Sequence, residues 1–331
     1  MFEEVGYSST VPESPFADGE GEVMPKFYLT DLSPKDKSWD IHRSKAEEVS
    51  VIYHQVDYVN YASRINSCSQ VLFFGSLLDE QGQQVIKLKS ARFCRVRTCP
   101  VCQWRRSLMW KARLGKVLPL IQRDYPKVRW LHLVLSIRSC EIETLRENIK
   151  LMNAAWKRLT LLKIFPAIGW FKSLEITKGK DGTAHPHFHI LLMVEPKYFG
   201  KNYIKQEKWV ELWKKSLRVD YYPNAHIKAI KDINDGGTTL EAVKEVAKYT
   251  VKGDDLVAEK EWLAEYTRQV HKMRAIAVGG ILKKYLSDEE ASNDELVAGD
   301  SESKPEDITD PYYFAHWDKP DGRYTIDTLD S

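Results

Sequence analysis

Three histidines alternate with other residues in one short apolar segment, and this segment constrains the fold and the chemistry of the chain most strongly. The sequence runs His185-Pro186-His187-Phe188-His189 and continues into apolar residues up to position 194. Because successive side chains of a strand point to opposite faces, His187 and His189 are predicted to project from the same face. Two neutral imidazoles side by side on a rigid sheet can clamp a divalent metal ion.

A predicted hairpin supplies a third candidate ligand. The segment at 178–183 contains two glycines and an aspartate, which is typical of a turn between two strands. If this turn centres near Asp181, Glu175 is the cross-strand partner of His187, and directly paired residues share a face. Glu175, His187 and His189 would leave coordination positions open for a phosphate and water, and we expect Mn²⁺ or Mg²⁺ there. The alternative is that Glu175 is a surface residue of an edge strand.

Two further histidines lie near this segment. Pro186 interrupts the strand ladder and can re-aim His185, which is as good a candidate for a loop residue or a phosphate contact as for a metal ligand. His132 stands alone in an apolar strand predicted at 130–137. A lone histidine in such a strand is more often a core residue with its hydrogen bonds satisfied, and we assign His132 to the core.

A helix predicted at 240–251 carries the candidate nucleophile, Tyr249. Residues four apart share a helix face, so Glu245 lies beside Tyr249, and Lys252 follows on the same side. A phenol is a poor nucleophile near neutral pH unless a metal polarises the phosphate that it attacks. Glu245 can act as a general base, and Lys248 and Lys252 can bind the phosphate. The alternative is an ordinary amphipathic helix with a tyrosine at the edge of the core.

Four of the five cysteines have the spacing of a zinc site. Cys99 and Cys102 are separated by two residues, as in a zinc knuckle, and Cys68 and Cys94 lie at the ends of an apparent hairpin that can bring them together. A redox pair at Cys99 and Cys102 is the rival interpretation, but the thioredoxin-like context is missing. Cys140 remains as a buried thiol. We therefore expect structural Zn²⁺.

Charge is distributed unevenly along the chain. Residues 1–50 carry a net charge of −6, residues 287–331 carry −11, and residues 51–286 carry +19. A basic body between acidic ends is typical of a nucleic-acid-binding protein with solvated tails. The residues expected to contact DNA next to the zinc knuckle are Arg95, Arg97, Arg105 and Arg106. Tryptophans interleaved with the basic residues could stack on single-stranded DNA, although tryptophan is usually a core residue; they are Trp104, Trp110, Trp130, Trp156, Trp170, Trp209 and Trp213.

The alternation of elements predicts an α+β fold. Because the two strands before and after the turn at 178–183 form a hairpin, the sheet is at least partly antiparallel, which argues against a doubly wound parallel sheet. Strands are predicted at 130–137, 170–177, 187–194 and 225–230, and helices at 46–66, 141–163, 204–218 and, for the most part, 254–286. The predicted domains are an acidic, disordered arm at 1–45, a cysteine-rich zinc and DNA-binding module at 46–125, a core at 126–286 with the histidine strand and the tyrosine helix, and an acidic, mostly disordered tail at 287–331, in which an aromatic cluster at 311–317 can dock.

Location is inferred from what the sequence lacks. No run is long and apolar enough to span a bilayer, and the first residues have no apolar signal-peptide core. Five cysteines in a chain of 331 residues do not indicate a secreted disulfide scaffold. We therefore expect a soluble, cytoplasmic protein.

Three segments together resemble the replication initiators of small rolling-circle plasmids, which belong to the HUH endonucleases. They are Phe93-Cys94-Arg95-Val96-Arg97-Thr98-Cys99-Pro100-Val101-Cys102-Gln103-Trp104-Arg105-Arg106, the histidine segment at 185–189, and Glu245-Val246-Ala247-Lys248-Tyr249. They occur in the order found in that family. The resemblance implies an HUH core in which a central antiparallel sheet of the ferredoxin or RRM kind, flanked by helices, carries the metal ligands His187 and His189.

The resemblance also implies an activity. The protein would nick a single-stranded site in a plasmid origin with Tyr249, form a 5′-phosphotyrosine link, and release a 3′-hydroxyl that primes synthesis. Glu245 would activate water for hydrolysis at termination, with strand transfer as the other possible end. No Walker-type loop is present, so we expect unwinding to come from a separate host helicase or from DNA supercoiling. A single-strand binding protein and a host DNA polymerase, which would extend the 3′-hydroxyl, are the other expected partners. The alternatives are an HUH transposase or relaxase, and a non-catalytic, zinc-dependent DNA-binding regulator of copy number.

Overall fold

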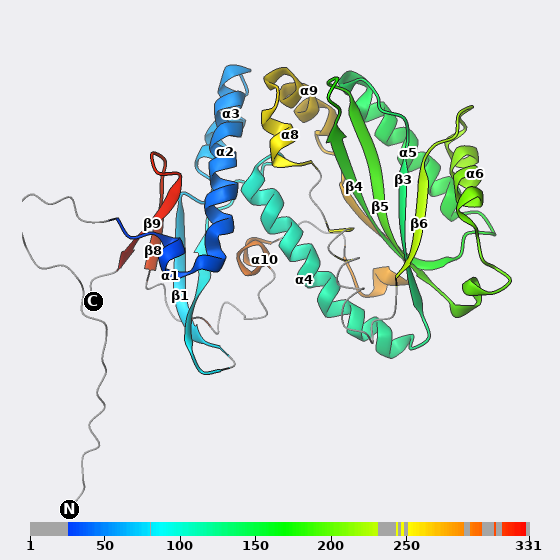
Figure 1. Cartoon of the computed structure of the whole chain (residues 1–331), viewed down its shortest axis with the longest axis horizontal. Helices are drawn as coiled ribbons and strands as arrows, with labels where there is room; N and C mark the ends of the chain where they lie inside the picture. The colour runs from blue at the N-terminus through cyan, green and yellow to red at the C-terminus, as the bar shows by residue number, and fades with distance from the viewer. Residues whose placement is uncertain are drawn as a thin grey trace, which may run out of the picture.

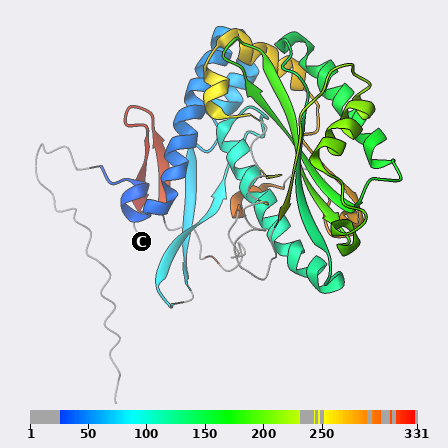
Figure 2. The same ribbon diagram turned by 45° about the vertical axis from the view of Figure 1, so that its right-hand side comes forward.

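The chain folds into two antiparallel sheets, each with its own helices, on either side of one long helix. This helix, α4 (Pro100–Asp124), lies between the two halves of the molecule (Figures 1 and 2). The α+β class is therefore confirmed. Among the helices of the described chain, not one is both long and apolar enough to cross a membrane. The structure, a computed structural model, describes residues 26–79, 81–230, 243, 246–247, 251–287, 292–299, 308 and 313–328.

The five-stranded sheet contains the histidine segment. Its strand order is β6-β3-β5-β4-β7, and all neighbouring strands run antiparallel. The turn between β4 and β5 is closed by Asp181, whose carboxylate accepts a hydrogen bond from Thr183 Oγ1 at 2.7 Å, and Gly182 has a φ of 83° in the left-handed region. The predicted hairpin is confirmed. The strands are β3 (Arg129–Ser136), β4 (Ala167–Lys178), β5 (Ala184–Val194), β6 (Ala225–Ile230) and β7 (Ile276–Gly280).

Both faces of this sheet are covered near its centre. Helices α5 (Leu145–Thr160) and α6 (Gln206–Leu217) pack against one face, where the Trp213 indole donates a hydrogen bond to the Ser136 carbonyl at 2.9 Å. On the other face, Trp110 of α4 contacts Phe171 with ring centroids 5.4 Å apart. The segment from Phe188 to Val194 is buried throughout, because a strand covered on both faces has no solvated side.

The four-stranded sheet unites the two ends of the chain. Its order is β2-β1-β8-β9, so β8, from the acidic C-terminal region, pairs with β1. Tyr324 of β9 is fully buried and donates a hydrogen bond to the Ser69 carbonyl at 2.6 Å. The expectation of a mostly disordered tail from residue 287 is therefore wrong for the described part of the tail, since aromatic side chains anchor it; the expected docking of the aromatic cluster holds for 313–317. The elements are β1 (Val71–Leu78), β2 (Gln84–Ala91), β8 (Tyr313–Asp318), β9 (Arg323–Thr328) and helix α10 (Asn293–Ala298).

The N-terminal helices begin earlier than the sequence predicts. Instead of one helix at 46–66, the chain forms α1 (Leu29–Leu32), α2 (Lys37–Gln55) and α3 (Val59–Asn66). The break after α2 falls at Asp57, whose φ of 61° is incompatible with a continuing right-handed helix. The disordered arm predicted at 1–45 is thus wrong from residue 26 onward, because Trp39 packs into the core with 1% of its surface exposed.

The segment predicted as mostly helical at 254–286 contains α8 (Gly253–Val257) and α9 (Lys260–Val270) and then the edge strand β7. Gly280 ends β7 with a φ of 60°, and a Cβ atom there would lie 2.3 Å from the Ile168 carbonyl oxygen. This close approach requires glycine. Helices α8 and α9 lie along the upper edge of the molecule in the view of Figure 1, between α2 and β4.

Candidate metal centres and nucleic-acid surface

The histidine strand and its hairpin partner bring three candidate ligands together. Glu175 pairs with His187 across the β4–β5 hairpin, so the predicted register is confirmed. One carboxylate oxygen, Glu175 Oε2, lies 3.1 Å from His187 Nε2 and 2.8 Å from His189 Nε2. We refer to Glu175, His187 and His189 as the Glu-His-His group.

This group is buried and polarised. Glu175 is 9% exposed and His189 is 7% exposed. Burial acts to raise the pKa of the Glu175 carboxyl, but hydrogen bonds to His187 and His189 outweigh burial and hold the pKa well below its usual range. The carboxylate is therefore ionised at neutral pH. One carboxylate and two imidazoles, with ligand atoms within 4.8 Å of one another, fit a divalent cation.

The Nδ1 atoms of the two imidazoles, on the side of each ring away from Glu175, also have polar partners. His187 Nδ1 lies 3.2 Å from the backbone carbonyl oxygen of His185. His189 Nδ1 lies 3.3 Å from Nε2 of His132, and the two rings stack with centroids 5.5 Å apart. The side chain of His185 turns away to Ser139 Oγ at 3.2 Å and is not one of the converging ligands.

The contact between His132 and His189 was not predicted, because a lone histidine in an apolar strand indicates a core residue. His132 pairs with Leu191 in the β3–β5 ladder, and Leu191 shares a face with His189 two residues earlier in the same strand. Predicting this contact requires the strand order, since β3 must lie next to β5 for the two histidines to meet. The local sequence pattern does not reveal the strand order.

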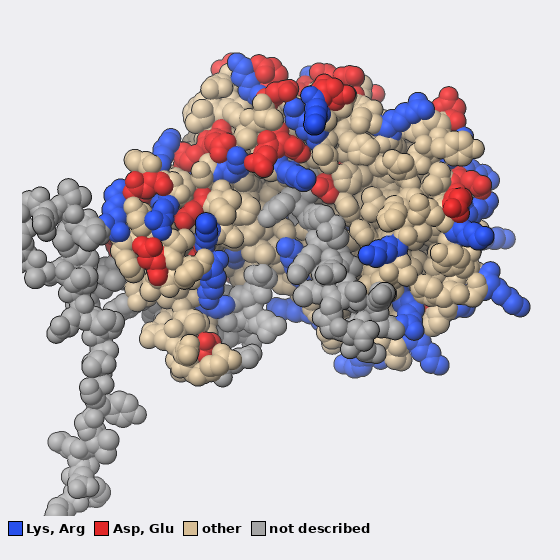
Figure 3. Space-filling view, viewed as in Figure 1, with Lys and Arg blue, Asp and Glu red and all other residues tan. Residues whose placement is uncertain are grey.

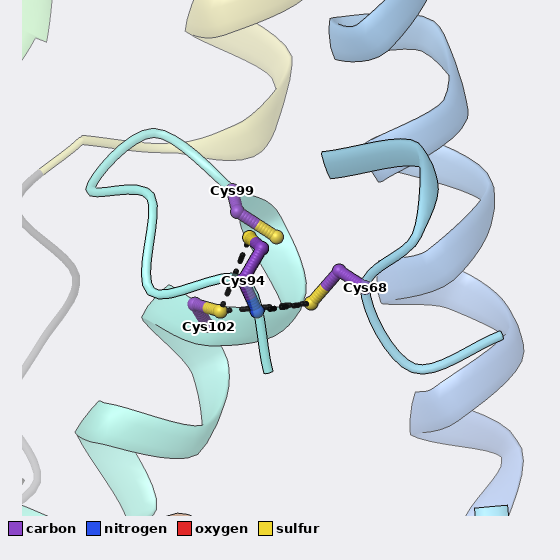
Figure 4. A group of neighbouring side chains, drawn as sticks. All are labelled: Cys68, Cys94, Cys99 and Cys102. Atoms are coloured by element: carbon purple, nitrogen blue, oxygen red, sulfur yellow. Dashed lines mark hydrogen bonds between the residues drawn. The ribbon is translucent and has the colours of Figure 1, made fainter. Parts of the chain in front are cut away.

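Four cysteines form a second cluster, as predicted (Figure 4). The Sγ atom of Cys102 lies 3.6 Å from those of Cys68 and Cys94. Four thiolates placed about 2.3 Å from a central zinc ion lie about 3.8 Å apart, so these separations fit a tetrahedral zinc site. Cys68 precedes β1 and Cys94 follows β2, so the β1–β2 hairpin brings the first two sulfurs together as expected. We refer to these residues and Cys99 as the four-cysteine cluster.

The start of α4 favours negative charge on Cys102 of the four-cysteine cluster. Cys102 lies in the first turn of α4, where backbone amides and the helix dipole stabilise a thiolate, whereas burial and the neighbouring cysteines raise the pKa of the Cys99 thiol at the N-cap. Hydrogen bonds with Cys68, Cys94 and Cys99 lower the pKa of the Cys102 thiol below its usual value, and the Arg106 charge acts in the same direction. All five cysteines are free of disulfides.

A chain of buried hydroxyls joins the four-cysteine cluster to the other half of the molecule. Thr98, next to Cys99, contacts the Tyr53 hydroxyl through Oγ1 at 2.6 Å. The same Tyr53 hydroxyl lies 2.6 Å from Thr267 Oγ1 in α9. Arg97 adds a hydrogen bond to the Val270 carbonyl at the end of α9, at 3.3 Å.

The arginines expected to contact DNA differ in their placement. Arg95 is exposed, and its carbonyl accepts a hydrogen bond from the half-buried Arg106 at 3.0 Å. Arg105 does not fit the expected DNA contact, since it is 6% exposed. Its guanidinium donates to the carbonyls of Leu296 and Val297 in α10, at 2.7 and 2.6 Å. Arg105 therefore fixes α10 onto α4.

The tryptophans are core residues rather than an open stacking surface. Six of the seven interleaved tryptophans are at most 9% exposed, and Trp170 is half-buried against Trp156. On the face drawn in Figure 3, Lys and Arg side chains predominate along the lower right edge, over the half that contains the five-stranded sheet. Charge, rather than exposed tryptophan, is what this face offers to a nucleic acid.

The predicted nucleophile Tyr249, its neighbour Glu245 and Lys248 lie outside the described residues. The described positions around them, 243, 246, 247 and 251, are buried, at the spacing expected for the inner face of the predicted helix. Lys252 is exposed and is the N-cap of α8. Helix α8 and the N-cap of α9 are tied to the end of β4, because Lys178 contacts Asp255 and Glu259 at 3.3 and 2.8 Å. Lys178 is the last residue of β4, the strand that also carries Glu175.

The fold and these centres define an α+β protein with two sheets, one Glu-His-His group and one four-cysteine cluster, each able to hold a metal ion. A family model described as "Replication protein" matches residues 85–325, and the chain belongs to this family.

Individual relatives agree with the family match. The chain is 32% identical over 297 residues to "Protein rep" of Bacillus amyloliquefaciens, which covers 81% of this chain and 84% of the relative. It is 34% identical over 267 residues to "Protein rep" of a Bacillus species, covering 74% and 83%. It is 30% identical over 267 residues to "Protein rep" of Streptococcus pneumoniae serotype 2, covering 78% and 82%. No solved structure matches the chain significantly.

Proposed function

We propose that this protein is a plasmid rolling-circle replication initiator that nicks a single-stranded site in the plasmid origin. The observation that carries the proposal is the Glu-His-His group on adjacent strands of an antiparallel sheet, in a chain that belongs to the replication protein family. The Glu-His-His group would hold Mn²⁺ or Mg²⁺, and the four-cysteine cluster would hold structural Zn²⁺.

The proposed reaction is a transesterification by Tyr249. The Tyr249 oxygen attacks the scissile phosphorus, the bond from phosphorus to the 3′ oxygen breaks, and the 3′ oxygen leaves as a hydroxyl after taking up a proton. A bound divalent cation supplies charge stabilisation at the phosphate. One phosphodiester replaces another, so the step needs no nucleotide cofactor. The free 3′-hydroxyl primes synthesis, and the 5′ end stays attached to Tyr249.

The neighbouring residues have defined roles in this proposal. Glu245 accepts a proton from the attacking water when the phosphotyrosine is hydrolysed at termination, with strand transfer as the other route. Lys248 and Lys252 bind the phosphate backbone, together with the exposed Arg95. Origin DNA is the direct partner, and a host helicase, a single-strand binding protein and a host DNA polymerase supply unwinding, strand protection and synthesis in the cytoplasm.

A nicking assay tests the proposal. Labelled single-stranded oligonucleotides tiled across the DNA that flanks the protein's own gene are incubated with zinc-loaded protein and Mn²⁺ or Mg²⁺. We expect cutting at one site by wild type, and a loss of about 100-fold or more in His187→Ala, because metal charge stabilisation is worth several kcal/mol. The matched control is His271→Ala, an exposed histidine after α9.

Three results would overturn the proposal. Tight binding of origin DNA by wild type without cutting in either metal would favour the non-catalytic DNA-binding regulator. Equal cutting by wild type and His187→Ala would mean that the nuclease activity does not depend on the Glu-His-His group. A cut site at a transposon end or a transfer origin would instead favour the transposase or relaxase.

A further inference from the structure

Both ring nitrogens of each histidine in the Glu-His-His group have a polar partner, but the partner of Nδ1 differs between the two histidines. Each directs Nε2 toward Glu175 Oε2 and Nδ1 toward a second polar atom on the other side of the ring. For His187 that atom is the backbone carbonyl oxygen of His185, whereas for His189 it is Nε2 of His132. The second arrangement depends on one residue that a substitution can remove.

The position of His132 is fixed by the sheet. It lies near the middle of β3, where it pairs with Leu191 of β5 on one side and with Lys228 of β6 on the other. Its ring lies at 16° to that of His189, so the two imidazoles are nearly parallel. His132 is outside the set of atoms that converge as possible ligands, so its contact with the group is through His189.

The chemistry of imidazole explains what His132 would do. A neutral imidazole that offers Nε2 to a cation carries its proton on Nδ1. His189 is 7% exposed, so this N–H needs a protein acceptor, and a buried donor without one costs about 1–3 kcal/mol. Nε2 of His132, 3.3 Å away, is placed to accept this hydrogen bond.

We propose that His132 is a positioning residue that fixes the tautomer and the ring orientation of His189, and thereby sets the affinity of the Glu-His-His group for its divalent cation. This inference rests on the proposed function, in which that group holds Mn²⁺ or Mg²⁺. Partners that orient a metal-binding histidine in this way typically change metal affinity by about 10- to 100-fold when they are removed.

Three substitutions of His132 distinguish the effect of its hydrogen-bond acceptor from the effect of its ring packing against His189. His132→Phe keeps an aromatic ring against His189 but removes the acceptor. His132→Gln places an amide oxygen near the position of Nε2, whereas His132→Asn places one near Nδ1, which does not face His189. Each variant is compared with wild type after zinc loading, and circular dichroism and the unfolding midpoint verify that it is folded.

The measurement is Mn²⁺ affinity, from the electron paramagnetic resonance signal of free Mn²⁺ during a titration, with His189→Ala as the reference for loss of the site. We expect His132→Phe and His132→Asn to bind Mn²⁺ about 10- to 100-fold more weakly than wild type, and His132→Gln to recover most of the affinity. A merely structural role in packing would not distinguish Gln from Asn.

The outcomes distinguish this inference from the proposed function. Wild-type Mn²⁺ affinity in a folded His132→Phe variant overturns the inference, even if wild type nicks DNA. Equal weakening in the Gln and Asn variants also overturns it. If wild type binds Mn²⁺, the affinities follow the expected order and origin DNA is not cut, the proposed function fails while the positioning role of His132 stands. Absence of Mn²⁺ binding by wild type overturns both.

Discussion

We expect the stability of this protein to depend on pH because of a buried lysine, Lys172, in β4 next to β5. Lys172 of β4 is 5% exposed and faces α5, where its Nζ atom donates to Asn153 Oδ1 at 2.9 Å. The same Nζ lies 3.7 Å from the ring centroid of Phe188, which lies between His187 and His189 in sequence. Burial lowers the pKa of Lys172 from 10.5 to about 7. Among the described residues, no carboxylate forms an ion pair with Lys172.

The direction of the pH dependence follows from the number of protons that Lys172 binds in the folded and the unfolded chain. Between pH 7 and 10.5, Lys172 binds a proton in the unfolded chain but largely not in the folded one, so the free energy of unfolding rises with pH in this window. At about 1.36 kcal/mol per pH unit, the change that is due to Lys172 between pH 7.5 and 9.5 is about 2.5 kcal/mol. Below pH 7 the full penalty of burying the charge is present.

The assay is urea unfolding of wild type and Lys172→Met at pH 7.5 and 9.5. The variant removes the amine but fills the space, so we expect it to be more stable than wild type at pH 7.5 and the difference to shrink by about 2.5 kcal/mol at pH 9.5. Taking the double difference cancels the other titrating groups. Lys157→Met, an exposed lysine on the same helix as Asn153, is the matched control. Parallel pH dependence of wild type and Lys172→Met would refute the reasoning.

Three further predictions concern the four-cysteine cluster and the contacts of the residues around it. Cys102→Ser should lose the one zinc per chain that elemental analysis is expected to find in wild type, whereas Cys140→Ser should keep it; a zinc-free, folded wild type would contradict this. Tyr53→Phe removes the hydroxyl between Thr98 and Thr267, and urea unfolding should show a loss of about 1–3 kcal/mol, with no change counting against the hydroxyl chain. Arg105→Ala should lower the free energy of unfolding by about 3 kcal/mol in the same assay, because it removes the buried hydrogen bonds to α10. Arg95→Ala should change the free energy of unfolding by about 0.5 kcal/mol or less, and should weaken binding to single-stranded DNA in low salt. The reverse order of the two arginine variants would contradict their placement.

Features fixed by short-range patterns could be predicted from the sequence. The turn at Asp181 and the alternation of strand residues were enough to pair Glu175 with His187, and β6 was predicted with its bounds at 225–230. The four-cysteine cluster was predicted because knuckle spacing and a hairpin are both local signals. In each case the residues involved are joined by a short stretch of chain, so backbone geometry leaves few alternatives.

Features that depend on distant parts of the chain were missed. The role of His132 depends on β3 lying beside β5, and the burial of Arg105 depends on α10, about 190 residues further on. The acidic composition of the tail suggested a solvated segment, yet β8 and β9 complete a sheet begun by β1 and β2. Composition averages over charged and aromatic positions, whereas docking depends on a few side chains such as Tyr324.

The central claim is that Tyr249 attacks a phosphate next to the Glu-His-His group, and the covalent product tests it most directly. Wild type and Tyr249→Phe are incubated with labelled single-stranded origin DNA and Mn²⁺, denatured, and digested with protease, and the DNA-linked peptide is identified by mass spectrometry. We predict a 5′-phosphate linked to Tyr249 in wild type, with neither a nick nor an adduct in Tyr249→Phe. An adduct on another residue, or cutting that persists in Tyr249→Phe, would contradict the account.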